Sequence, residues 1–260
     1  MKLVLPMLLT FNILFFILNC GLDIEDPASP SPPQWIPKSL PEEWPERGID
    51  AHESSGIFLE WDAKPEEDII GYHIYRANWY ELNDTIGEYD LLAKVDVESS
   101  LELNYIDREI HQLHRYYYKL KAEDVSQKLS VFSDSISYSI LPPMNYSAMH
   151  PNGLTDTLRN RTFSWDYAAF IALDDFCITI LTESNELLLR RIVQPSNYVG
   201  RNEFWTIPSG IEMDSNIVYK WRIDTCAEYE SGRETSGSES SWATFQPAEF
   251  GQLVVIGVGN

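Results

Sequence analysis

The sequence has little basic charge, little histidine and little cysteine. Nineteen Lys and Arg stand against 40 Asp and Glu, for a formal net charge of -21. Such a chain repels phosphate backbones, so nucleic acid is not an expected partner. Five histidines and three cysteines are scattered, and the densest acidic run, residues 66–68, lacks the spaced ligands of a calcium loop. No nucleophile, zinc or phosphate-loop motif occurs. We therefore expect no enzyme activity, no cofactor and no metal site.

A long apolar run occurs near the N-terminus, at residues 3–18, directly after Lys2. Pro6 interrupts the run, and acidic residues follow soon after it. A helix that spans a membrane needs about 20 apolar residues, so this run is short for that role. A basic residue followed by a short apolar stretch is typical of a signal peptide. We predict a signal peptide at residues 1–19, with a plain membrane helix as the alternative.

Residues 17–20, which read Ile-Leu-Asn-Cys, resemble the lipobox of bacterial lipoproteins. Asn19 departs from the Gly, Ala or Ser that usually precedes the cysteine. The resemblance implies that Cys20 carries lipid after cleavage and anchors the protein to a membrane, because several acyl chains give stable anchoring. Gly21 replaces the aspartate that is linked to inner-membrane retention. The expected location is therefore the cell envelope, as an exported outer membrane lipoprotein on either the periplasmic or the surface-exposed face.

Residues 20–44 are expected to form the lipidated cysteine and a Pro-rich linker. Prolines recur through this segment with no apolar period, at Pro27, Pro30, Pro32, Pro33, Pro37 and Pro41. Proline favours extended polyproline conformations with a rise of about 3 Å per residue. The segment is thus predicted to be a semi-rigid spacer that lifts the rest of the chain off the membrane.

From Gly48 onward, short apolar runs alternate with polar residues and are separated by turn-forming residues. Ile57, Leu59 and Trp61 alternate in one run, and residues 116–122 alternate in a later one. Period-two alternation places one face of a strand in a core, and helical periodicity is nearly absent. Several such strands at this spacing predict an all-β chain with antiparallel sandwiches.

Residues 45–141 resemble a fibronectin type III domain, which has an immunoglobulin-like fold. Trp61 matches the core tryptophan of the second strand in that family, and Gly71 with Tyr72 matches the start of the third. Ile110 precedes Tyr116 by six positions, as at the corner where a tyrosine bonds back to the backbone. The resemblance implies a β-sandwich over nearly this whole segment.

Residues 142–246 repeat the pattern more loosely and predict a second, divergent fibronectin type III-like domain in tandem with the first. Trp165 corresponds to Trp61, and Tyr219 follows Met213 by six positions. Residues 247–260 form a C-terminal tail with an apolar run at 250–258. An exposed apolar strand invites pairing, so the tail is interpreted as an edge strand, a docking segment for a partner, or a frayed end.

Cys177 and Cys226 remain once Cys20 is assigned to lipid. Phe176 and Ile178 are expected to face the core, so Cys177 faces away from it, and the same parity holds for Cys226. The family resemblance implies that their two strands are antiparallel neighbours. A cross-strand disulfide is therefore one prediction for this exported chain, and two unpaired thiols are the alternative.

Four aromatic residues, Trp79, Tyr80, Tyr198 and Trp205, lie in expected loops and are candidate ligand contacts. Burial at a sandwich edge is the simpler interpretation of such rings. The hypothesis that accounts for fold and anchor together is a non-enzymatic, membrane-anchored lipoprotein that acts as a protein-binding, adhesion or spacer module. The alternative is a carbohydrate-binding accessory lipoprotein that contacts polysaccharide through a flat platform of rings.

Overall fold

The computed structural model of the chain describes residues 28–53, 55–63, 66–97, 103–156, 158, 160–167, 169, 171–196 and 201–248. In these ranges the regular structure is β-strand apart from short 3-10 turns such as Tyr146–Ala148. The all-β prediction is confirmed for this part of the chain. None of its helical segments has the length and apolar character needed to cross a membrane. Cys20 and the signal peptide, like Tyr198 and residues 249–260, lie outside the described residues.

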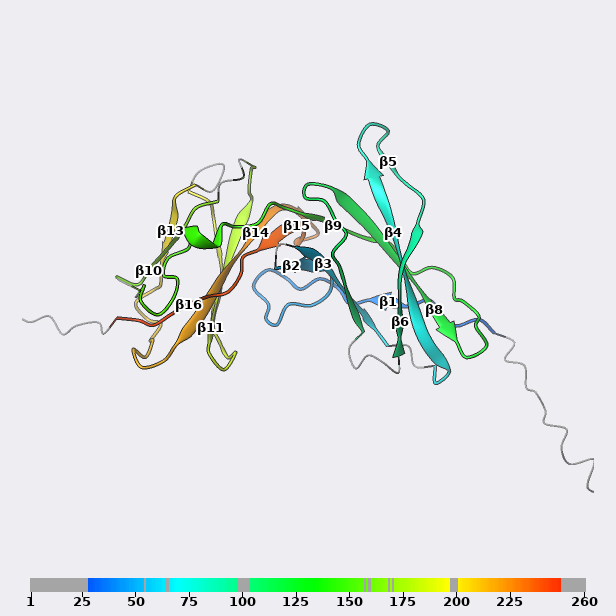
Figure 1. Cartoon of the computed structure of the whole chain (residues 1–260), viewed down its shortest axis with the longest axis horizontal. Coiled ribbons are helices and arrows are strands. Elements are labelled where there is room, and N and C mark those ends of the chain that lie inside the picture. The colour runs from blue at the N-terminus through cyan, green and yellow to red at the C-terminus, as the bar shows by residue number, and fades with distance from the viewer. Residues whose placement is uncertain are drawn as a thin grey trace, which may run out of the picture.

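The first half of the structure is a sandwich of two sheets (Figure 1). One sheet has β3 (Gly56–Asp62) at its centre, and its other strands are β1 (Gln34–Trp35), β2 (Asp50–His52) and β7 (Asn104–Asp107). The opposing strands are β4 (Ile69–Tyr80), β5 (Thr85–Ile86), β6 (Asp90–Asp96), β8 (Arg115–Asp124) and β9 (Ile136–Ile140).

The core of the first sandwich confirms the alternation read from the sequence. Ile57, Leu59 and Trp61 are buried on β3, and the Trp61 ring meets the Tyr72 ring edge-on at 5.7 Å. The predicted corner is also present, since the His111 N–H donates to the Tyr116 hydroxyl at 2.9 Å. Burying these large rings removes much apolar surface from water, which is the main favourable term in folding.

The second half is another sandwich. Its small sheet pairs β10 (Thr162–Trp165) with β13 (Glu203–Thr206). Its larger sheet contains β11 (Asp175–Thr182), β12 (Leu187–Val193), β14 (Tyr219–Glu230), β15 (Arg233–Glu239) and β16 (Ala243–Phe245).

The second core repeats the first in its key contacts. Trp165 is buried, and its ring lies 5.3 Å from Phe176. The Asp214 N–H donates to the Tyr219 hydroxyl at 3.0 Å. The donor precedes the tyrosine by five positions in both sandwiches, so the internal repeat extends to the corner bond.

The two sandwiches share one sheet. β9 of the first pairs in parallel with β15 of the second, with Ser139 opposite Ser236 and Ile140 opposite Gly237. The Leu141 N–H then donates to the Gly237 carbonyl at 2.9 Å. A Cβ at position 237 would lie 2.6 Å from the Tyr138 hydroxyl and 2.7 Å from a backbone oxygen, so glycine permits this close approach.

The segment predicted to be a spacer is part of the folded body from Gln34 onward. β1 pairs with β3, and Trp35 packs edge-on against Trp61 at 6.3 Å. Farther along, the Pro41 carbonyl accepts a hydrogen bond from Arg190 Nε of the second sandwich at 2.7 Å. The prediction that residues 20–44 form a semi-rigid spacer is therefore wrong for residues 34–44. Proline keeps its carbonyl group and ring surface available for packing against the sandwiches.

Candidate functional site: the charged junction

The candidate aromatic contacts are not brought together in the described part of the chain. Trp79 and Tyr80 are neighbours at the end of β4 and point to opposite faces, and the Trp79 ring lies 5.9 Å from Tyr117. Trp205 lies on β13 of the other sandwich and packs near Phe163 at 6.4 Å. These three rings do not form one platform.

The two remaining cysteines lie on the face of the sheet opposite the second core, as parity predicted, but both are buried thiols outside any disulfide. Cys177 is opposite Asp224, and Cys226 is opposite Asp175. The cysteines are thus diagonal neighbours, at about 7–8 Å in an antiparallel pair, beyond the usual reach of a disulfide. The predicted bridge is therefore wrong, and Cys177 and Cys226 are not joined by a disulfide.

This face is buried because residues 38–46 lie across it. Cys177 donates its S–H to the Pro41 carbonyl at 3.4 Å. The Glu46 carboxylate forms ion pairs with Arg190 of β12 and Arg222 of β14. The N-terminal segment therefore contacts β11, β12 and β14 of the second sandwich through backbone and charge.

Arg222 is the centre of the ionic network. Its Nε lies 2.8 Å from Asp224 Oδ1, and its Nη2 lies 2.6 Å from Glu239 Oε1. Its guanidinium also lies over two indole rings, 5.9 Å from the Trp44 centroid and 5.0 Å from the Trp242 centroid. One cation thereby joins the N-terminal segment to two strands of the second sandwich.

A second cation, Lys38, joins the same elements on the other side. It forms an ion pair with Asp50 of β2 and another, at 3.0 Å, with Glu234 of β15. The Tyr138 hydroxyl of β9 donates to the same Glu234 carboxylate at 2.8 Å. Residue 38 of the N-terminal segment and β9 of the first sandwich thus both contact one carboxylate of the second sandwich.

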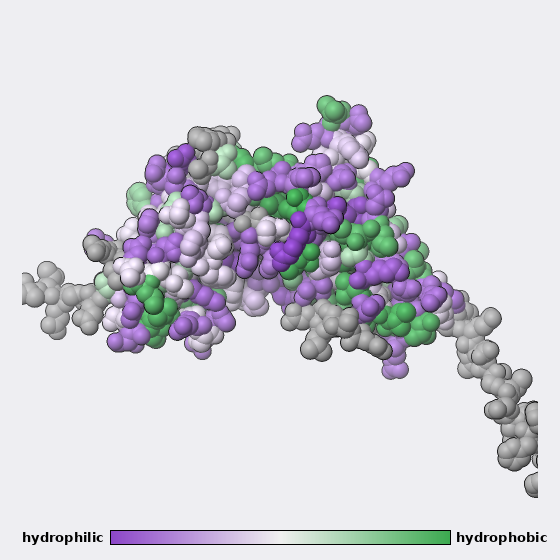
Figure 2. All heavy atoms as spheres, in the orientation of Figure 1, coloured by the Kyte–Doolittle hydropathy of each residue, from purple (hydrophilic) through white to green (hydrophobic). Residues whose placement is uncertain are grey.

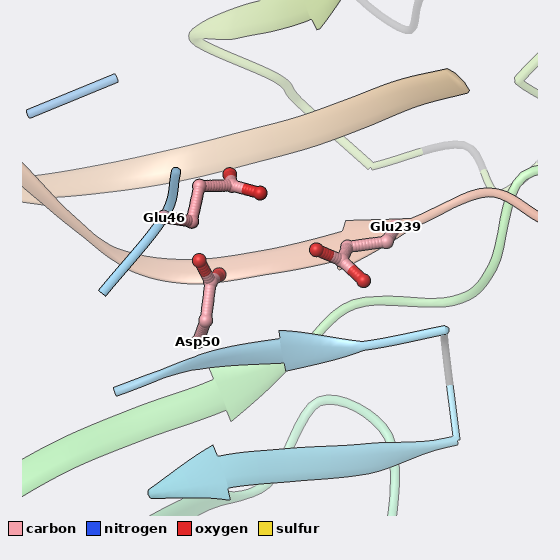
Figure 3. Close-up of side chains that lie close together, drawn as sticks. All are labelled: Glu46, Asp50 and Glu239. Carbon is pink, nitrogen blue, oxygen red and sulfur yellow. The ribbon is translucent and has the colours of Figure 1, made fainter. Parts of the chain in front are cut away.

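Three carboxylates converge at the centre of the junction. Figure 3 shows Glu46, Asp50 and Glu239 pointing toward one another from different elements. One oxygen from each lies within 4.8 Å of the others, beside a cavity of about 180 Å³. Each of the three is already paired with Arg190, Arg222 or Lys38. The arrangement is a network of ion pairs rather than an open cation cage.

Acidic groups outnumber basic groups in this buried network. The carboxylates are Glu46, Asp50, Asp224, Glu234 and Glu239, and the cations are Lys38, Arg190 and Arg222. Burial raises the pKa of Glu234 to about 7 against the opposing effect of Lys38. Burial likewise raises the pKa of Asp224 to about 6 and that of Glu239 well above its ordinary value.

Glu46 differs from its neighbours. Burial alone would raise its pKa, but Arg222 and Arg190 outweigh burial and hold the pKa below its ordinary value. The network therefore contains one firmly ionised carboxylate and several that resist ionisation. Sequence reasoning missed it because alternating Lys220, Arg222 and Asp224 on a strand is typical of a solvated face.

No protein-family model matches the chain, and no curated protein is similar to it in sequence. Among solved structures, the chain is similar to tandem fibronectin type III domains over 84% of its length. The FN1-FN3 domains of chicken CNTN1 are 13% identical, with 69% of that chain covered and a TM-score of 0.36. The two-domain segment of chicken tenascin is 11% identical, with 97% covered and a TM-score of 0.29.

A β-1,2-glucanase from Parabacteroides distasonis matches 45% of this chain at 25% identity and a TM-score of 0.30. This chain spans 14% of the length of that glucanase. TM-scores this low add nothing to the assignment of function. The sandwich fold rests on the strand order and the two buried cores.

Proposed function

We propose that this protein is a non-enzymatic, membrane-anchored lipoprotein of the bacterial cell envelope that acts as a protein-binding, adhesion or spacer module. The observation that carries the proposal is the junction. The two sandwiches share a sheet through β9 and β15, and residues 38–46 connect both of them through ion pairs. A lipid on Cys20 would then hold both sandwiches as one body close to the membrane.

The hairpin formed by the end of β4 and by β5 supports the protein-binding part of the proposal. It projects from the first sandwich in Figure 1, and apolar atoms lie at its tip in Figure 2. Leu82 at the turn is 100% exposed, Tyr80 is 52% exposed and Ile86 is 43% exposed. Exposed apolar groups on a protrusion suit a protein partner with an apolar pocket.

Acidic residues flank this tip. Glu81 and Asp84 lie in the turn, and Glu88 follows β5. A pocket rimmed by Lys or Arg would therefore complement the hairpin. The carbohydrate-binding alternative needs exposed coplanar rings, and Trp79, Tyr80 and Trp205 do not provide them. We therefore favour a protein partner over polysaccharide.

Anchoring is tested by expressing the full chain and a Cys20→Ala variant in a bacterial host. Intact mass and membrane fractionation are measured for both. The proposal expects acyl mass and membrane sedimentation for the unaltered chain, and release of the variant from the membrane. If both chains stay unprocessed in the membrane, residues 3–18 are a plain anchor helix and the lipoprotein assignment fails.

A further inference from the structure

The junction between the sandwiches holds more negative than positive groups away from water. Five carboxylates face three cations there, and all eight side chains are at most 15% exposed. An uncompensated buried charge is costly, so the closed junction favours the neutral form of its surplus carboxyl groups.

We propose that the junction is a proton-linked clamp, in which the sandwiches and residues 38–46 dock with uptake of protons by Glu234, Asp224 and Glu239 and loosen as the pH rises. The clamp goes beyond the anchored-module function, because it concerns how the body opens and not what it binds. Its geometry comes from both sandwiches, since Tyr138 of β9 and Lys38 contact Glu234 of β15.

The groups that face each acid come from every element of the junction. Glu234 faces Lys38, Asp50 and Tyr138, and Cys177 also lies within its electrostatic reach. Asp224 and Glu239 face Arg222, Glu46 and Asp50, and Arg190 and Cys177 lie beside Asp224. The surrounding cations do not titrate near neutral pH, because neighbouring carboxylates raise the pKa values of Lys38, Arg190 and Arg222 against the effect of burial.

The direction of the pH effect follows from proton linkage. In an open, solvated junction these carboxyl groups return to ordinary pKa values of about 4 to 4.5. In the closed junction the pKa of Asp224 is about 6 and that of Glu234 is about 7. Their contribution to docking is therefore complete below about pH 4 and is lost as the pH rises through 6 and 7.

Glu46 acts in the opposite direction. Its pKa is lowered on closing, so its contribution to docking is present above its ordinary pKa and is lost as the solution becomes more acidic. Docking should consequently be tightest near pH 4, because the contribution of the three surplus carboxyl groups falls above that pH and the contribution of Glu46 is lost below it.

The chain carries its own reporter of opening. Cys177 and Cys226 are buried thiols, and residues 38–46 cover Cys177 through Pro41. When this segment lifts, Cys177 becomes accessible to a thiol reagent. The rate of modification, divided by the rate for the urea-unfolded chain at the same pH, then measures the opening equilibrium without the effect of thiol ionisation.

The experiment uses the full chain with Cys20→Ala, so that only the two junction thiols react, and a dithiodipyridine reagent that works in acid. From about pH 5 to 8, the relative rate should rise with pH. The rise is roughly tenfold per pH unit for each proton that the junction releases when it opens. Glu234→Gln should lower the slope of the logarithm of this rate against pH by about one, because one fewer proton is released. Glu230→Gln, an exposed acid on β14, is the matched control and should leave the slope unchanged.

A relative rate that is the same at pH 5 and pH 8 overturns the clamp. The clamp is also overturned if the rate rises only at pH values where the far-ultraviolet circular dichroism of the chain is lost. The thiols would then react through global unfolding. Should Glu234→Gln fail to fold, Asp224→Asn replaces it as the variant that lowers the slope. An unchanged slope in a folded variant of either kind contradicts the assignment of the protons.

Discussion

Tyr138 and Glu234 belong to different sandwiches, and the Tyr138 hydroxyl donates a hydrogen bond to the Glu234 carboxylate across 2.8 Å. The Tyr138 side chain is buried, and the bond lies beside the pairing of β9 with β15. A hydrogen bond to a charged or polar partner in such a place contributes more than an exposed one. The stability of each sandwich is therefore linked to its docking on the other.

Tyr138→Phe removes this hydroxyl and keeps the ring. We expect the free energy of unfolding to fall by about 1 to 2 kcal/mol, because Glu234 loses one of its two partners. Urea unfolding near pH 5 measures the change. Tyr89→Phe is the control, since its hydroxyl lies 2.8 Å from Ser135 at the surface, and it should change stability by less than about 0.5 kcal/mol. Equal losses in the two variants would contradict the role of the junction bond.

Arg222→Met removes the central cation and retains much of the side-chain volume. Glu46, Asp224 and Glu239 would then face one another with less positive charge, and we expect a loss of about 3 to 5 kcal/mol in unfolding free energy. Arg47→Met is the matched control, because Arg47 pairs with Glu60 but is 51% exposed, and its loss should stay below about 1 kcal/mol. A small effect at Arg222 would show that the network does not support the fold.

Tyr116→Phe and Tyr219→Phe each remove one corner bond. We expect each to lower the unfolding free energy by about 1 kcal/mol. The two tyrosines lie in different cores and share no partner, so the double variant should show the sum within about 0.5 kcal/mol. A loss at only one position would mean that the second corner does not repeat the role of the first.

A photo-crosslinking residue at Leu82 should give a discrete protein adduct in intact cells, because this side chain is fully exposed at the hairpin tip. The same residue at Val125, which is 64% exposed on another turn, is the control. Tyr80→Asp should abolish the adduct at position 82 without changing thermal stability. The hairpin is not the contact surface if the adduct still forms in Tyr80→Asp, or if it forms equally well at Val125.

Much of the fold could be predicted from the sequence, because alternation records which face of a strand meets a core. Trp61, Tyr116 and Trp165 were placed correctly on that basis. The junction could not be predicted, since Arg222 and Asp224 have the same pattern whether water or another segment covers them. Proline content suggested a free spacer, and composition does not reveal that the Pro41 carbonyl is bound by Arg190.

The disulfide prediction failed for a related reason. Parity placed Cys177 and Cys226 on one face, which is where they lie, but it does not fix register. The register sets Asp224 opposite Cys177 and Asp175 opposite Cys226, and a slip of two residues preserves the face while it separates the thiols.

The charged junction holds the two sandwiches together as one body. This docking is tested most directly by the distance between two spin labels, measured by pulsed electron paramagnetic resonance at pH 5. One label is placed at Val125 of the first sandwich and the other at Leu187 of the second, and both positions are exposed. We expect a single narrow distance distribution in the unaltered chain, and a broader distribution in Arg222→Met. A broad distribution in the unaltered chain at pH 5 would contradict it, because the sandwiches would then move independently.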